Sequence, residues 1–346
     1  VLSHHLWGDD ESMEVLMQEI EAHLLGKEDA LPAPVPFRNF VAEVRSGVGR
    51  SEHEAYFRSQ LGDVSEPTLP YGLRDVQGTG ADVRECRHPL SAELSRRIRE
   101  AARREGVSAA SVFHLAWAQV LARLSGREDV VFGTLLLGRM RGGEGSVRGM
   151  GLFINTLPLR LSLQGLDAKS ALRLTHRNLA QLLRHEYASL ALAQRCSGVQ
   201  APAPLFSALM NFRHSPMPAH SSAEGALPEV LRGMRVVRAS ERTNYPVALS
   251  VDDHGIHQGV DAGFSLNPQL LSPYEPERIA GYVECALEGL LKAIEHAPDT
   301  AIGALPIVPE HERDALIAGF NPVPQPAPEG DLARQIEDWA RHQPDA

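Results

Sequence analysis

The sequence has 346 residues, 43% of them hydrophobic and 23% charged, a balance typical of a globular protein with a large buried core. Its net charge of -10 excludes an overall basic field that would hold nucleic acid or an anionic membrane surface. No apolar run reaches the ~18 residues that cross a bilayer, and the N-terminus lacks the regions of a signal peptide. We therefore expect neither nucleic acid nor a membrane as a partner.

The cysteines are Cys86, Cys196 and Cys285, an odd number at wide spacing. They offer neither a disulfide framework nor the paired spacing of a zinc site. This usage favours a protein of the reducing cytoplasm. Because the chain begins at Val1 rather than at Met, in what resembles the middle of a strand, we expect a fragment of a longer protein.

In chain order, apolar periodicity predicts alternating helices and strands. Ser91 and Ser108 are suited to begin two helices that Gly106 and Gly126 end. Two further stretches, 62–80 and the proline-rich 321–328, are expected to be connections. The predicted helices span 12–25, 91–106, 108–126, 171–183, 276–295 and 331–340, and the predicted strands span 129–137, 152–163, 204–213 and 244–252.

The segment His4-His5-Leu6-Trp7-Gly8-Asp9-Asp10 carries the strongest chemical signal. Imidazole titrates near neutrality, which suits it to proton transfer from an amine or a hydroxyl, and an acid four residues later could fix its position. From these residues alone, one packed and one exposed histidine would fit equally well. Adjacent residues of a strand point to opposite faces, so His4 and His5 are poorly placed to bind one metal ion together.

This segment resembles the HHxxxDG motif of condensation domains of nonribosomal peptide synthetases, which belong to the chloramphenicol acetyltransferase-like superfamily. Further segments resemble the family in the same order along the chain. These segments are Val130 to Thr134 with Gly138-Arg139, Gly151 to Arg160, His185-Glu186, Pro204 to Phe212, Thr243 to Leu249, and Ile336 to Ala346. The last of them is similar to the opening of an adenylation domain.

The resemblance implies an α/β fold of two chloramphenicol acetyltransferase-like lobes, each a mixed sheet with flanking helices, with the first lobe incomplete. It implies the remainder of the first lobe and the lobe connection in 1–88, the second lobe in 89–300, a linker in 301–328 and the start of an adenylation domain in 329–346. The family's first lobe supplies an arginine that pairs with the motif aspartate. Nothing precedes Val1 to supply it, so we expect this partner to be absent.

The resemblance also assigns roles. His5 is the expected catalytic residue, His4 orients it, and Asp9 holds local structure through an ion pair. Asp10, Arg139, Asn155 and Asn211 are expected to support the substrate tunnel or only the packing of the structure around it. Asp10 replaces the motif glycine, and we expect it to cap the helix that begins near Ser12. The alternative is that its charge also stabilises the protonated form of His5.

The implied activity is amide bond formation between a donor acyl or peptidyl thioester and an acceptor aminoacyl thioester. Both are carried on phosphopantetheine arms of upstream and downstream peptidyl carrier domains, next to an adenylation domain, and no cofactor is bound directly. The alternatives are an epimerising or ester-forming enzyme of the superfamily and a degenerate domain that serves as a docking platform.

Overall fold

The computed structural model describes residues 6–78, 80–139, 149–214, 243–255, 263–320 and 332–343. The chain divides into two compact units, Val1–Ile307 and Val308–Ala346. The histidine pair and the N-terminal strand expected at 1–3 lie outside the described residues.

A mixed sheet forms the centre of the first unit, with strand order β1-β7-β6-β5-β3-β4, and β2 pairs with β7. The strands β3, β5 and β6 run parallel to one another. β4 is antiparallel to β3, β7 is antiparallel to β6, and β1 and β2 are antiparallel to β7. The strands are β1 (Val83–Glu85), β2 (His88–Pro89), β3 (Asp129–Leu136), β4 (Asn155–Ser162), β5 (Ala208–His214), β6 (Val247–Asp253) and β7 (Phe264–Leu271).

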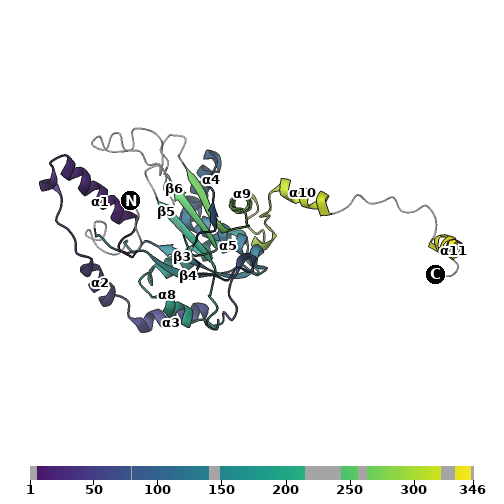
Figure 1. The fold of residues 1–346 in the computed structure, drawn as a ribbon, viewed down its shortest axis with the longest axis horizontal. Helices are drawn as coiled ribbons and strands as arrows, with labels where there is room; N and C mark the ends of the chain where they lie inside the picture. Colours follow the sequence, from purple (N-terminus) through teal and green to yellow (C-terminus); the bar gives the residue numbers. More distant parts are fainter. Residues whose placement is uncertain are drawn as a thin grey trace. The chain divides into compact units, whose positions relative to one another are not determined.

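A layer of mutually packed helices covers this sheet: α4 (Ala92–Glu105), α5 (Ala109–Ser125), α7 (Ala168–Leu183) and α9 (Pro276–His296) (Figure 1). The Ser91 hydroxyl caps α4 by accepting a hydrogen bond from the Leu94 amide at 3.1 Å, and Gly106 ends the helix in the left-handed conformation. α5 is apolar on nearly every side because it lies between the sheet and the other helices, and its Trp117 is fully buried.

The first 61 residues add helices α1 (Asp10–Leu24), α2 (Phe37–Ser46) and α3 (Arg50–Leu61), with a short 3-10 turn η1 (Glu28–Ala30) after α1. α3 lies beside α8 (Leu190–Arg195), as Figure 1 shows. A second 3-10 turn, η2 (Pro70–Gly72), lies in the connection to β1, and η4 (Ile302–Ala304) follows α9. The second unit contains α10 (Glu310–Phe320) and α11 (Leu332–His342).

Candidate active site

The motif aspartate, Asp9, is the N-cap of α1. Its carboxylate accepts the Ser12 amide at 3.1 Å, and the Asp9 amide donates to the Ser12 hydroxyl at 3.4 Å, which together form a capping box. Ser12 is fully buried, and its hydroxyl also accepts the Gly151 amide at 3.2 Å. The turn that follows the histidine segment is therefore tied to the backbone just before β4.

Asp9 forms a buried ion pair with Arg139, which lies three residues beyond the end of β3. Only 3% of the Asp9 side chain and 7% of the Arg139 side chain are exposed. Arg139 donates through Nη2 to Oδ1, and through Nε to Oδ2 at 3.2 Å. Burial by itself raises the pKa of Asp9, but the hydrogen bonds from Arg139 and Ser12 and the charge of Arg139 outweigh it and hold that pKa below its usual value.

Arg139 is itself fixed by its surroundings. Its guanidinium lies over the ring of Phe153, 3.9 Å from the centroid, and Nη1 donates to the Gly149 carbonyl at 3.1 Å. The preceding Gly138 has φ +67°, and a Cβ there would overlap the Phe153 carbonyl oxygen. A glycine before this arginine is thus required by both backbone conformation and space.

Two expectations about this turn were wrong. The partner arginine of the motif aspartate is present within the chain, because Arg139 approaches Asp9 from the loop after β3 rather than from an upstream segment. The cap of α1 is Asp9 and not Asp10, because α1 begins at Asp10, two residues before the expected Ser12, and the Asp9 carboxylate binds the free amide of Ser12. The side chain of Asp10 lies outside the described residues.

Asn155, the first residue of β4, orients neighbouring backbone. Its Nδ2 donates to the carbonyls of Glu186 and Ala188, at 2.7 Å each, and so holds the turn between α7 and α8 against the sheet. In this turn the ring of His185 stacks on Tyr56 of α3, with centroids 4.0 Å apart, and its Nδ1 lies 3.0 Å from the Nδ1 of His53. Burial lowers the pKa of His53, which favours the neutral form in this contact.

Asn211 lies in β5, opposite Ser250 of β6. Within the described residues its Oδ1 is buried and has no hydrogen-bond partner. Phe212, the next residue, contacts Phe113 of the helix layer, so the alternation of a strand turns Asn211 to the opposite face of the sheet. The structure thus places Asp9, Arg139 and the start of β4 in one cluster, while Asn211 is two strands from β4 and shares none of the cluster's hydrogen bonds.

The sequence interpretation missed two residues of the cluster, Ser12 and Phe153. The Phe153 amide donates to Asp9 Oδ2 at 3.3 Å, and its ring supports Arg139. A local signal existed for Ser12, because a serine three residues after an aspartate matches the spacing of a capping box. No local signal pairs Phe153 with Arg139.

Among the described residues, no group of three or more His, Cys, Asp or Glu side chains is arranged to hold a metal ion. In the same part of the chain, no single helix is long and apolar enough to cross a membrane, and α4 and α5 meet those limits only as a pair bent by 107°.

Solved structures share this fold. A four-domain nonribosomal peptide synthetase, holo-AB3403 bound to AMP and glycine, has a TM-score of 0.68 at 14% identity, over 98% of this chain and 26% of that one. The X-domain from teicoplanin biosynthesis, in its complex with OxyB, has a TM-score of 0.65 at 17% identity, over 89% of this chain and 69% of that one. At these identities the likeness concerns the fold alone.

Relatives are also similar in sequence. Malpibaldin synthetase of Mortierella alpina is 44% identical over 346 residues, which is 100% of this chain and 6% of that protein. The chain therefore spans a small part of the length of this relative. A family model described as Condensation domain matches residues 1–317, and the chain belongs to the condensation-domain family.

Proposed function

We propose that this chain forms the amide bond of nonribosomal peptide synthesis. The donor is an acyl or peptidyl thioester on one carrier domain and the acceptor is an aminoacyl thioester on a second. Membership of the condensation-domain family supports peptide bond formation in general. Beyond family membership, we propose that both substrates are tethered to carrier domains and that His5 takes up the proton.

The observation that carries the proposal is the buried Asp9–Arg139 pair. It fixes the turn directly after the histidine segment to the loop that leaves β3. Four residues of chain reach at most ~14 Å, so His5 must lie within that distance of Asp9. An ion pair at this position therefore fixes the chain four residues after the histidine beside the end of β3, which supports the proposed role of His5.

His5 takes a proton from the α-amino group of the acceptor as its nitrogen attacks the donor carbonyl carbon. The C–N bond forms, the C–S bond of the thioester breaks, and the departing thiolate receives a proton. Placing two tethered reactants next to each other can contribute about 7–11 kcal/mol to lowering the barrier. Asp9 acts as a positioning residue, since its carboxylate is already occupied by Arg139 and Ser12.

The partners in this proposal are upstream and downstream peptidyl carrier domains and an adjoining adenylation domain. The substrates arrive on phosphopantetheine arms, and no cofactor is bound directly. The resemblance of 336–346 to the opening of an adenylation domain supports the last partner. The structure describes α11 in that segment, within a compact unit separate from 1–307.

A docking platform is the second candidate. The X-domain that shares this fold is in a complex with OxyB, so a protein of this fold can carry a partner. The Asp9–Arg139 pair would stabilise the N-terminal turn equally well in such a protein, and Asp10 stands where the family motif has glycine.

The test is a two-carrier assay with the intact parent synthetase, in which both arms are loaded and the dipeptidyl product is followed. His5→Ala should lower product formation by about 10²–10⁴-fold, the usual contribution of a general base, with adenylation and loading unchanged. The matched control is His296→Ala, because that histidine is 74% exposed at the end of α9. Undiminished product from His5→Ala would reject the catalytic proposal and favour the docking platform.

Two further assays separate the enzymatic alternatives. An ester-forming enzyme should prefer an acceptor that carries a hydroxyl group in place of the amine. An epimerising enzyme should exchange the α-hydrogen of a single carrier-bound aminoacyl group with deuterated water.

A further inference from the structure

Two aromatic rings of α2 contact the cluster around Asp9 and Arg139. Phe37 and Phe40 have ring centroids 5.3 Å apart, and both contact the ring of Phe153, at 5.2 Å and 4.4 Å between centroids. Phe153 is only 3% exposed, and the Arg139 guanidinium lies over its ring. α2 therefore reaches the buried ion pair through a single intervening side chain.

Phe40 has a second route to Arg139, through Tyr187 in the turn between α7 and α8. The two rings meet edge to face, with centroids 5.3 Å apart and an angle of 81° between their planes. The Tyr187 hydroxyl donates to the Gly138 carbonyl at 3.1 Å, directly before Arg139 in the chain. Displacement of Phe40 would loosen both the ring beside the guanidinium and the backbone that carries it.

Phe37 supports the other half of the cluster. Its ring lies so close to Gly151 that a Cβ on that residue would overlap the ring. The Ser12 hydroxyl lies 3.0 Å from the Gly151 carbonyl oxygen and accepts the Gly151 amide at 3.2 Å. Because Ser12 forms the capping box with Asp9, the ring of Phe37 supports the backbone to which the start of α1 is bound.

The helix that carries these two rings is otherwise weakly attached. None of the residues of α2 is fully buried, and Val41 is 41% exposed. The segment before the helix contains Pro32, Pro34 and Pro36, which donate no backbone hydrogen bonds. An aromatic pair changes an equilibrium by about two- to tenfold beyond the effect of the area that it buries. The docking of α2 therefore depends on its two phenylalanines.

We propose that Phe37 and Phe40 are positioning residues of the candidate active site. With α2 docked, the two rings hold the side chain and the backbone against which the buried ion pair is fixed. With α2 released, the turn at Asp9 loses this support, and the histidine segment before it loses its fixed direction. The effect on peptide bond formation rests on the proposed role of His5, whereas the effect on the Asp9 turn does not.

Hydrogen exchange of the full chain, measured peptide by peptide, tests the effect on the turn. Phe40→Ala should open α2, and it should also increase the opening of α1, measured on peptides from 9–24, by about tenfold, because aromatic contacts to the cluster are lost. Phe40→Tyr keeps the ring and should restore protection. In the background of Asp9→Asn the ion pair is already broken, so adding Phe40→Ala should change the opening of α1 by less than about threefold.

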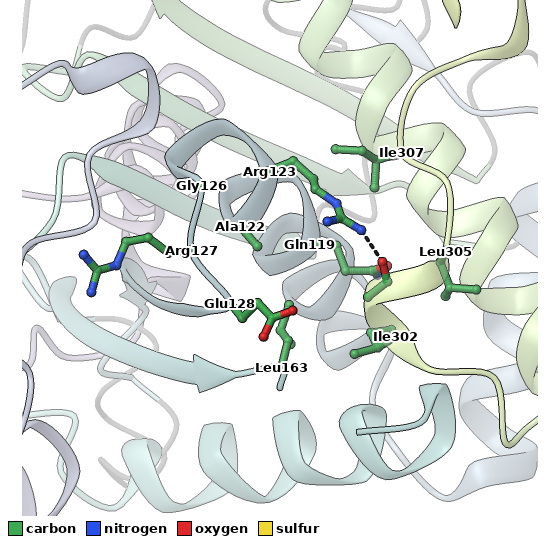
Figure 2. Close-up of a pocket in the computed structure, with 11 residues that line it drawn as sticks. Gln119, Ala122, Arg123, Gly126, Arg127, Glu128, Leu163, Ile302, Leu305 and Ile307 are labelled. Carbon is green, nitrogen blue, oxygen red and sulfur yellow. Dashed lines mark hydrogen bonds between the residues drawn. The ribbon is translucent and has the colours of Figure 1, made fainter. Parts of the chain in front are cut away.

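Two control variants remove contacts outside the cluster. Val41→Ala shortens an exposed side chain of the same helix. Arg123→Ala removes a hydrogen bond to the Gly303 carbonyl, beside the cavity of about 330 Å³ at the end of α5 (Figure 2). That cavity borders the beginning of β3, and at about 3.3 Å per residue the strand places it roughly 25 Å from the end that leads to Arg139. Both variants should leave peptides from 9–24 as protected as in the wild type.

The two-carrier assay tests the effect on the reaction. A displaced histidine weakens the transition state more than it weakens the binding of the loaded carriers. Phe40→Ala should therefore lower kcat by about tenfold or more and change the KM for the acceptor carrier by less than about twofold. Phe40→Tyr should recover kcat. Protection of α5 and an unchanged rate of adenylation show that each variant is folded.

Unchanged protection of 9–24 in a Phe40→Ala variant whose α2 is open overturns the proposal, and so does an equal increase of opening in the Asp9→Asn background. An unchanged kcat in that variant, while His5→Ala impairs condensation, also overturns it. If His5→Ala itself has no effect, the proposed condensation chemistry is rejected, and the exchange results alone support or overturn the role of the two rings.

Discussion

Breaking the Asp9–Arg139 pair should release α1 from the sheet. Asp9→Asn keeps the size of the side chain and one acceptor oxygen, but it leaves the Arg139 guanidinium buried beside a neutral amide. Because both side chains are more than 90% buried, the loss of one partner should cost about 3–5 kcal/mol. At about 1.4 kcal/mol per tenfold change, local opening of α1 should increase roughly 100- to 5000-fold.

Hydrogen exchange measures this opening locally and does not require two-state unfolding of the whole protein. Peptides that cover 9–24 should lose protection, while peptides from α5 should not. The comparison variant is Asp63→Asn, which removes an ion pair with Arg160. The Asp63 side chain is 72% exposed. Exposed pairs contribute about 0–1 kcal/mol, so this change should have little effect.

A double-mutant cycle isolates the interaction from the two substitutions. Arg139→Met removes the charge while retaining a flexible apolar stem over Phe153. The double variant buries no unpaired charge. Its loss of stability should therefore be smaller than the sum of the losses in the two single variants, by about 2 kcal/mol or more. Additive costs, or single variants that leave α1 as protected as in the wild type, would refute the conclusion that this pair fixes the turn.

Three further predictions follow from buried polar contacts. Asn155→Ala removes two hydrogen bonds of 2.7 Å to backbone carbonyls and should destabilise the turn at 186–188 by about 1–3 kcal/mol, which limited proteolysis can check against Asn178→Ala. Gly138→Ala places a Cβ against the Phe153 carbonyl at a positive φ, so exchange of α1 should rise; unchanged exchange would contradict the described loop. Burial lowers the pKa of His114 from 6.5 to about 4, so the folded chain resists a proton that the unfolded chain accepts; stability should fall as pH drops from about 6.5 to about 4, by up to about 1.4 kcal/mol per pH unit. Protection of α5 at pH 7 and 5, corrected for intrinsic exchange, measures this loss, and a folded His114→Gln variant that still shows it would exclude this histidine as the cause.

The elements that the sequence predicted well are those with local boundary signals. The helices expected at 91–106 and 108–126 are α4 and α5, because Ser91 and Ser108 cap them and Gly106 and Gly126 end them. Such signals act over three or four residues and need no knowledge of the fold. The buried strand expected at 129–137 is β3, which ends one residue earlier.

The strand β7 was not predicted, for a physical reason. It contains Asn267-Pro268, a pair typical of turns, and proline disfavours the interior of a sheet. β7 nevertheless pairs along its length with β6, and its other side faces only the short strands β1 and β2. The Pro268 carbonyl accepts the Cys86 amide at 3.3 Å, so proline's lack of a donor does not prevent pairing on that side.

For the site, too, local features were predictable from the sequence and long-range contacts were not. The histidine segment, Asp9 and the Gly138-Arg139 dipeptide were each identified from the sequence, but their pairing was not. Asp9 and Arg139 are 130 residues apart, and only the path of β3 and the backbone before β4 brings them together. A tertiary contact of this kind has no period or cap that a single sequence displays, which explains why the partner arginine was sought upstream.

The weak packing of α1 explains why an ion pair is needed at this turn. Val15 is its one buried hydrophobic residue within the described part of the chain, while Leu24 is 59% exposed and Ile20 is 39% exposed. Burial of one valine contributes only about 1.5–3 kcal/mol, which is small beside the conformational entropy of fixing a helix. Directional polar contacts to Arg139, Gly151 and Phe153 must therefore set the position of the helix start. Because these contacts have defined geometry, they hold the turn in one orientation. The residues directly before Asp9 are covalently joined to this turn, so its orientation restricts the direction of the chain there.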